Sequence, residues 1–337
     1  MDLWALNRRL SEALVAFAWD EWAQMGVSAA TQRRSPWAQD PEALIVFTLE
    51  IARDDPRLFD ELLDWLVVSE SLLSVRRLRA MCVDDTDTAL TEGALAWLDR
   101  QRPRSRLRPG RQAARARDAL EPLFRPAGVV PTADEDFAAA GLLRSSPLAS
   151  GKSRAPHPTA PINLAFRLRH ILGVGIRAEI VRVLLTTADA RVTAQTLAQS
   201  TGYAKRNVHD ALTGLTTAGV VSAVAVRAEQ RYAADRAAWA ALLGSSPVNL
   251  PTHRDWPQLL AVLRRILRWS AQPELVHASA YLGASRARDL LDSLRPDLAF
   301  VGIAVGATPN PAGAWDDLDE VVDRTLAMLD VSVPAQR

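Results

Sequence analysis

Apolar residues recur at helical spacing at the start of the chain and predict that it begins with helices. Within residues 3–24 most of the apolar side chains fall three or four positions apart, which is typical of one amphipathic helix. They stand at Leu3, Leu6, Leu10, Leu14, Phe17 and Ala18. Asp40-Pro41 and Asp55-Pro56 each place a capping carboxylate before a proline, which predicts the starts of two more helices.

Further helices are predicted towards both ends of the chain. The stretches SLLSVRRLRAMC and DTALTEGALAWLDRQ continue the helical pattern, and six of the ten tryptophans lie before residue 99. We therefore expect a helical domain with tryptophan-anchored packing over residues 1–130. WPQLLAVLRRILRWS, SRARDLLDSL and AWDDLDEVVDRTLAMLD predict a helical C-terminal domain over residues 246–337, in which LAFVGIAVG could be a strand or a buried connection.

Two stretches between these ends have the composition of connections. Arginines alternate with helix breakers in residues 100–117, RQRPRSRLRPGRQAARAR, which argues against a buried element. Residues 145–161, SSPLASGKSRAPHPTAP, are rich in Ser, Pro and Gly and indicate a linker, which we place within residues 131–161. These features leave residues 162–245 as a separate middle domain.

The middle domain carries a distinctive order of elements. Residues 176–185 are helical, with Ile176, Ile180, Val183 and Leu184 on one face, and residues 190–192 are short and β-prone. Thr193 is a suitable N-cap for a helix over 194–200, and Thr201-Gly202 forms a tight break.

A second helix is expected from Tyr203, followed by two strands. Its apolar stripe comprises Ala204, Val208, Ala211, Leu212 and Leu215. Gly219 ends this helix at a position that tolerates a positive φ. Residues 220–226 and 231–234 have the side chains of two strands around the polar tip 227–230.

This order resembles the winged helix-turn-helix domain of bacterial transcriptional regulators, with a layout similar to the MarR and ArsR groups. The resemblance covers residues 162–243, about a quarter of the chain. It implies a central winged helix with a two-stranded wing. Together with the helical patterns of the flanking segments, this predicts a mainly α fold with a helical N-terminal domain and a helical C-terminal domain.

The resemblance also implies a set of DNA contacts, because such proteins insert the start of the second helix into the major groove. With the apolar stripe inward, Lys205, Arg206, His209 and Thr213 point outward and Asn207 lies at the boundary. Arg and Lys suit guanine or a phosphate, and Asn suits adenine. The expected DNA-binding residues are Thr193, Tyr203, Lys205, Arg206, Asn207, His209, Thr213, Arg227, Gln230 and Arg231.

Other interpretations of these residues stay open. Lys205 and Arg206 could be a solvated helix face, and His209 could be a surface histidine. Tyr203 could donate its hydroxyl to a phosphate or pack under the turn. Asp210 could limit non-specific binding or pair with Arg206 one helical turn away.

Charge is distributed unevenly along the chain. Residues 1–98 carry 9 basic and 17 acidic side chains, whereas residues 161–245 carry 10 basic and 5 acidic ones. A basic middle suits a polyanionic partner, although arginine-rich linkers can serve solubility alone. Arg76, Arg77 and Arg79 could form a second DNA-facing helix, but their acidic surroundings favour a solvated face or internal ion pairs.

Residues that could carry catalysis or bind a metal are scattered. The histidines show no metal-ligand spacing and stand at His157, His170, His209, His253 and His277. Cys82 is the single cysteine, which excludes an intrachain disulfide. The carboxylates of Asp85 and Asp87 suit a helix N-terminus better than a metal site. We expect no metal, no cofactor and no enzymatic activity.

The sequence thus predicts a cytoplasmic DNA-binding transcriptional regulator, a repressor that binds double-stranded DNA as a homodimer. It shows no signal peptide and no span of about 20 apolar residues, so no membrane association is expected. The alternative is a protein-interaction scaffold, or an antitoxin or phage-defence accessory protein, that uses the winged helix to dock a protein partner.

Overall fold

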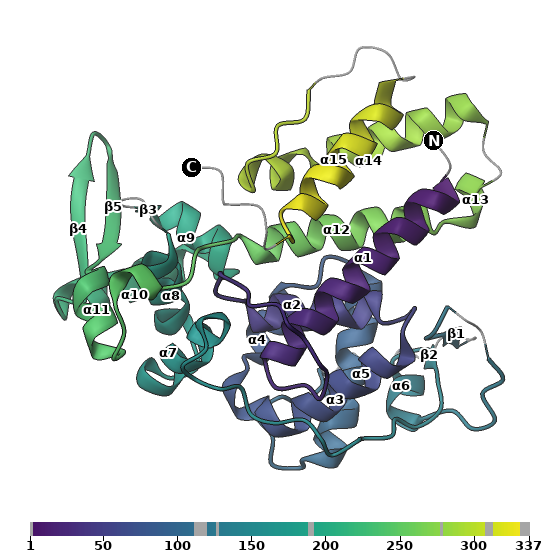
Figure 1. Cartoon of the computed structure of the whole chain (residues 1–337), viewed down its shortest axis with the longest axis horizontal. Helices are drawn as coiled ribbons and strands as arrows, with labels where there is room; N and C mark the ends of the chain where they lie inside the picture. The colour runs from purple at the N-terminus through teal and green to yellow at the C-terminus, as the bar shows by residue number, and fades with distance from the viewer. Residues whose placement is uncertain are drawn as a thin grey trace.

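The computed structural model describes residues 3–110, 120–125, 128–187, 192–276, 279–306 and 313–330. These residues form a mainly helical fold with small sheets (Figure 1). Residues 111–117 of the arginine-rich segment, residues 190 and 191 of the β-prone segment, and His277 lie outside the described residues. The apolar side chains gather in two cores.

The first core forms around a helix that is buried along its whole length. Its N-terminal helices are α1 (Leu3–Gln24), α2 (Pro41–Ile51), α3 (Pro56–Ser69), α4 (Val75–Ala80) and α5 (Asp85–Gln101). Every residue of α2 is buried, whereas the six apolar positions predicted for 3–24 form the buried face of α1. Asp40 and Asp55 cap α2 and α3 with their carboxylates, which confirms both predicted helix starts.

Tryptophans fill much of this core, as the sequence predicted. The rings of Trp22 and Trp65 lie 4.7 Å apart, and those of Trp37 and Trp256 lie 5.4 Å apart. The buried indole nitrogens have partners: Trp22 donates to the hydroxyl of Thr48, and Trp65 donates to a backbone carbonyl. Since these hydrogen bonds offset desolvation of the indole N–H groups, the large rings can be buried completely.

The C-terminal helices join this first core. They are α12 (Trp256–Ser270), α13 (Pro273–Val276), α14 (Ala280–Phe300) and α15 (Ala314–Ala327). Figure 1 shows α12 between α14 and α15 on one side and α1 and α2 on the other. Residues 256–329 therefore share one core with residues 3–142 instead of enclosing a core of their own. The stretch 298–306 is no strand, because α14 runs to Phe300 and a turn follows.

Residues after α5 also pack onto the first core. Ser105 and Leu107 are buried, so the expectation of no buried element in the arginine-rich segment is wrong for these two residues. Two short strands pair in parallel, β1 (Glu121–Pro122) with β2 (Leu142–Leu143), next to α6 (Glu135–Ala139).

Most of the expected linker is held by the first core. Arg144 is buried among three phenylalanine rings of that core, which places residues up to 144 within it. The backbone N–H groups of Gly151 and Ser153 donate to the Asp64 carboxylate, so the connection beyond is tied to α3. A 3-10 turn, η2 (Pro161–Asn163), leads into the second core.

The second core contains helices and a three-stranded antiparallel sheet. Its elements are α7 (Leu164–Leu172), α8 (Ile176–Thr186), β3 (Val192–Thr193), α9 (Ala194–Thr201), α10 (Lys205–Thr217), β4 (Val221–Val226), β5 (Glu229–Ala234), α11 (Arg236–Leu242) and η3 (Pro247–Asn249). The strand order is β3-β5-β4, and the β4–β5 hairpin projects from one end of the molecule (Figure 1).

Local signals placed these elements correctly. The Thr193 hydroxyl accepts the N–H of Thr196 and caps α9. Gly202 and Gly219 have φ values of +69° and +71°, which glycine adopts without strain at a helix end. The prediction that Ala204 belongs to the apolar stripe of this helix is wrong. The helix begins two positions later than expected, at Lys205, and Ala204 is the exposed residue before it.

Candidate nucleic-acid interface

The first turn of α10 presents two cations to solvent. Lys205 and Arg206 begin the helix, and both are exposed. The inward face of α10 comprises Val208, Ala211, Leu212 and Leu215, so the outward direction of the cations follows from the amphipathic stripe. Among the residues that the structure describes, neither cation has an ion-pair partner within 4.0 Å, so the pairing of Arg206 with Asp210 that the sequence left open is not formed.

The remaining predicted residues of α10 lie on or beside this outward face. His209 and Thr213 are exposed, and Asn207 is half-buried at the boundary. The hydroxyl of Thr213 donates to the backbone carbonyl of His209 at 3.0 Å, so its oxygen lone pairs remain available as acceptors. The exposed part of α10 therefore offers cationic, amide, imidazole and hydroxyl groups along a single helix.

Tyr203 does not point outward, and its predicted contact with a phosphate is corrected. Only 8% of the residue is exposed, and the guanidinium carbon of Arg76 on the first core lies 5.5 Å from the centre of its ring. Burial raises the pKa of this phenol, which keeps it protonated. The sequence left packing under the turn as the other possibility, and the structure shows that packing.

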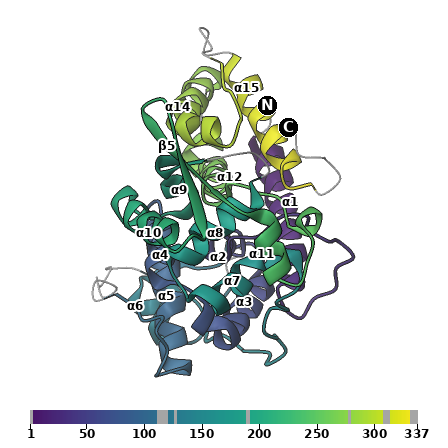
Figure 2. The same cartoon turned by 90° about the vertical axis from the view of Figure 1, so that its left-hand side faces the viewer.

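The β4–β5 hairpin lies at the same end of the molecule as α10 (Figures 1 and 2). Arg227 and Arg231 are exposed at and beside its tip, and Arg227 adopts a left-handed φ of +56° in the two-residue turn. Gln230 is exposed but already accepts a hydrogen bond from the Tyr232 hydroxyl at 3.0 Å. Thr193, which faces Arg231 across the sheet, uses its hydroxyl to cap α9.

The turn before α10 is fixed by the first core. The Nε atom of Arg77 on α4 donates to the backbone carbonyl of Thr201 at 2.9 Å. A side chain added to Gly202 would lie 2.7 Å from the terminal carbon of Met81, so glycine permits the close approach there. These contacts set the direction in which α10 begins.

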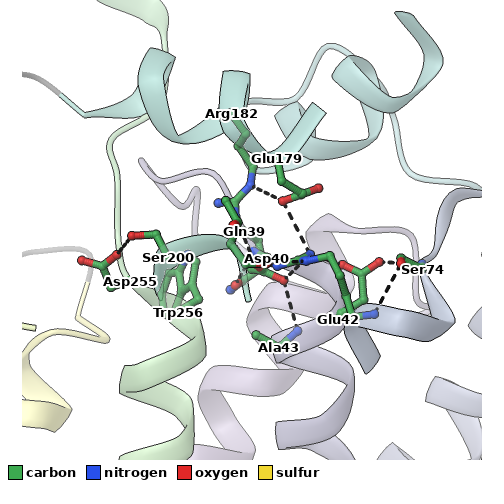
Figure 3. A network of polar contacts seen from close by, with 12 residues as sticks. Gln39, Asp40, Glu42, Ala43, Ser74, Glu179, Arg182, Ser200, Asp255 and Trp256 are labelled. Atoms are coloured by element: carbon green, nitrogen blue, oxygen red, sulfur yellow. Dashed lines mark hydrogen bonds and ion pairs between the residues drawn. The ribbon is translucent and has the colours of Figure 1, made fainter. Parts of the chain in front are cut away.

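Arg77 belongs to a buried ionic cluster between the two cores. Figure 3 labels four other members of this cluster, Asp40, Glu42, Glu179 and Arg182. The cluster consists of three carboxylates and three guanidinium groups, each with a side chain at most 1% exposed: Asp40, Glu42, Arg77, Arg169, Glu179 and Arg182. Asp40, Glu42 and Arg77 come from the first core, and the other three come from α7 and α8.

Contacts within the cluster cross between the cores. Arg169 bonds to Glu42 and to Glu179 at 2.7 Å each, and Arg182 bonds to Asp40 and to Glu179 at 2.9 Å each. Arg77 reaches Asp40 and Glu42, and its Nη1 lies 3.5 Å from Glu179. The prediction of internal ion pairs for the arginines of 71–81 is confirmed for Arg77.

The surrounding arginines determine the ionisation of the buried carboxylates. Burial alone would raise the pKa values of Asp40 and Glu179, but Arg77 and Arg182 outweigh it for Asp40. For Glu179 the same two arginines act together with Arg169. Both pKa values therefore lie below their usual values of 3.8 and 4.5, and both carboxylates are charged at neutral pH.

A second polar link joins the cores near α12. Asp255 accepts hydrogen bonds from Ser200 at 2.5 Å and from His253 at 2.9 Å, and the other ring nitrogen of His253 lies 3.2 Å from the Thr186 hydroxyl. Ser200 is bonded to the carboxylate and not to the imidazole, so this group lacks the contact by which a base activates a nucleophile. The Ser200–Asp255 hydrogen bond instead connects α9 to the start of α12 and has a structural role (Figure 3).

Other candidate chemistry has structural explanations. Asp85 and Asp87 lie at the start of α5 as expected, and Asp87 is buried against Arg264 and Arg268. No group of three or more potential metal-ligating side chains occurs within the described part of the chain. None of the helices described has both the length and the apolar character needed to cross a membrane.

Comparisons with protein families, with curated proteins and with solved structures find no match for this chain.

Replacing Arg77 with methionine should sharply reduce stability. The variant leaves Asp40 and Glu42 buried with less compensating charge, and breaking a buried ion pair costs about 3–5 kcal/mol. Arg57→Met on α3 is the matched control, because Arg57 is exposed and its replacement should change the free energy of unfolding by less than about 0.5 kcal/mol. Urea unfolding of the two variants measures the difference, and equal losses would contradict a structural role for the cluster.

The cluster should also make stability fall in acid. A folded-state pKa below the ordinary value of 4.5 means that the Glu179 contribution is complete above that pH and is lost as the pH falls. Glu179→Gln should be less stable than the natural chain at about pH 7, yet should lose less additional stability by about pH 4. Urea midpoints across this range test the effect, which is refuted if both proteins lose the same free energy.

Proposed function

We propose that this protein is a sequence-specific DNA-binding transcriptional regulator that uses residues 162–245 as a winged helix. The observation that carries the proposal is the open first turn of α10, where Lys205 and Arg206 are exposed and have no ion-pair partner among the described residues. Two such cations at a helix start suit guanine edges or backbone phosphates in the major groove.

The distribution of arginines supports this proposal. Arg169 and Arg182 of the second core form internal ion pairs in the buried cluster, and Arg236 donates to backbone carbonyls. Within the described residues, the exposed cations on α10 and on the hairpin form no such ion pair or hydrogen bond through their side chains. They lie at one end of the molecule, where they would attract a polyanion.

A repressor that acts as a homodimer in the cytoplasm is the form of the proposal that we favour. Two-fold symmetric regulators of this kind bind half-sites about 10 base pairs apart, one turn of the duplex. In such a complex α10 would occupy the major groove, while the arginines of the hairpin would contact the backbone or the minor groove. Neither use requires a cofactor or a catalytic group.

A protein-docking function is the second candidate, and one observation favours it. β4 is an edge strand of its sheet, and Val224 and Val226 on it are 39% and 40% exposed. An exposed edge with apolar side chains can pair with a strand of another protein. A scaffold, antitoxin or phage-defence accessory protein could use the hairpin in this way.

Replacing both α10 cations should distinguish the two candidates. Lys205→Ala/Arg206→Ala should weaken binding to a duplex selected from a random pool, by about 1–3 kcal/mol for each cation that reads a base. The measurement is an anisotropy titration of the full-length protein at several salt concentrations. If a cation contacts a phosphate, the slope of log K against log salt should become shallower by about 0.9 for that cation.

Arg286→Ala/Arg288→Ala on α14 is the control, because both arginines are exposed on the C-terminal helices. It should bind the duplex as the natural chain does. Unchanged binding of the α10 double variant would refute the proposed DNA contact. Failure of the natural chain to bind any duplex or heparin at low salt would favour protein docking.

A further inference from the structure

We propose that Arg76 of the first core contacts a backbone phosphate beside α10, so that both cores form the DNA-binding surface. This inference rests on the proposed function and extends it beyond the winged helix. Arg76 lies on α4, outside residues 162–245 and within the acidic first part of the chain. The sequence alone favours a solvated face or internal ion pairs for the arginines of this helix.

The structure places Arg76 next to the start of α10. Its guanidinium carbon lies 5.5 Å from the centre of the Tyr203 ring, and Tyr203 stands two positions before Lys205. Arg77 and Met81 touch the two residues that precede Tyr203. Contacts from α4 and the residue after it thus reach three successive residues of the turn that leads into α10.

Arg76 differs from the other two arginines of α4 in forming no ion pair within the described part of the chain. Arg77 is fully buried in the ionic cluster, and Arg79 pairs with Glu92 at 2.7 Å. Arg76 is exposed and makes no ion pair with any residue that the structure describes. Its guanidinium therefore keeps N–H donors for a ligand, and the planar group suits the bidentate geometry of a phosphate.

Stacking on Tyr203 prepares this guanidinium for binding. A cation over an aromatic ring is attracted by the negative face of the ring, and a side chain held in this way loses less entropy when it binds. Tyr203 is itself held in place by burial in the second core. Tyr203 thus contributes to the proposed interface indirectly, because its buried ring positions the guanidinium of Arg76.

The two cores hold Arg76 and the α10 cations in a fixed arrangement. The buried cluster joins α4 to α7 and α8, on which α9 and α10 pack. A duplex that receives α10 in its major groove carries a phosphate backbone along each edge of that groove. Arg76 lies at the leading end of α10, where one of these backbones would pass. Such a contact positions the helix and reads no sequence.

The test compares Arg76→Ala with Arg57→Ala in the full-length protein. Both arginines are exposed and stack over an aromatic ring, Arg57 at 5.2 Å from the Trp19 ring centre, but Arg57 lies on α3. On the selected duplex, Arg76→Ala should reduce the slope of log K against log salt by about 0.9, which is about an eightfold loss of affinity at about 0.1 M salt. Arg57→Ala should behave as the natural chain.

Arg76→Lys separates a phosphate contact from a structural role. A lysine keeps the charge, so the salt slope should return to that of the natural chain even if some affinity is lost with the bidentate geometry. A natural slope for Arg76→Ala would overturn the inference, whether or not its affinity is lower. If Lys205→Ala/Arg206→Ala loses binding while Arg76→Ala matches the control, the inference alone fails. If the double variant binds normally, the proposed function fails as well.

Discussion

The structure depends on the ionic cluster buried between the two cores. Moving six charged side chains out of water is unfavourable, and the mutual attraction of the charges offsets this only when every member is in place. Three carboxylates face three guanidinium groups, so the buried charge is balanced. Half of the charges come from each core, and neither core alone can satisfy its own set. The cluster therefore favours one arrangement of the two cores and opposes any partial separation.

This constraint sorts the arginines of the chain into two populations. Those in the cluster and those facing Glu50 and Asp87 are neutralised internally, and they add little to the field outside the molecule. Arg76, Arg206 and the arginines of the hairpin are exposed to solvent. The net charge of a segment therefore overstates its pull on a polyanion where arginines are buried. A segment with a negative net charge can still expose a single cation that could contact a phosphate, as Arg76 shows.

The sequence predicted local structure well because local structure has local causes. Asp40, Asp55 and Thr193 cap their helices through hydrogen bonds to residues at most three positions away, and Gly202 ends a helix through its own backbone freedom. The outward direction of the α10 cations followed equally from the spacing of apolar residues on the same helix. No distant contact was needed for any of these predictions.

Features that depend on distant contacts could not be predicted in this way. Glu42 and Arg169 are 127 positions apart, and no periodicity indicates that they meet. For the same reason, the sequence did not predict that the C-terminal helices pack onto the first core. Tyr203 was ambiguous because an amphipathic pattern shows which face is covered, but not which neighbour covers it. Recognising the role of Arg76 required knowing that α4 is that neighbour.

The buried cluster also restricts how the proposed DNA binding could be regulated. A signal that moved α10 relative to α4 would have to separate the Arg77 contacts to Thr201 and to the carboxylates, at a cost of several kcal/mol. Typical coupling energies between distant sites are only about 1–3 kcal/mol. The β4–β5 hairpin is the freer element, because it projects from the second core and its exposed residues lie outside the cluster. Regulation at modest energetic cost would therefore act on the hairpin or on the proposed pairing of two copies, and the position of α10 would stay constant.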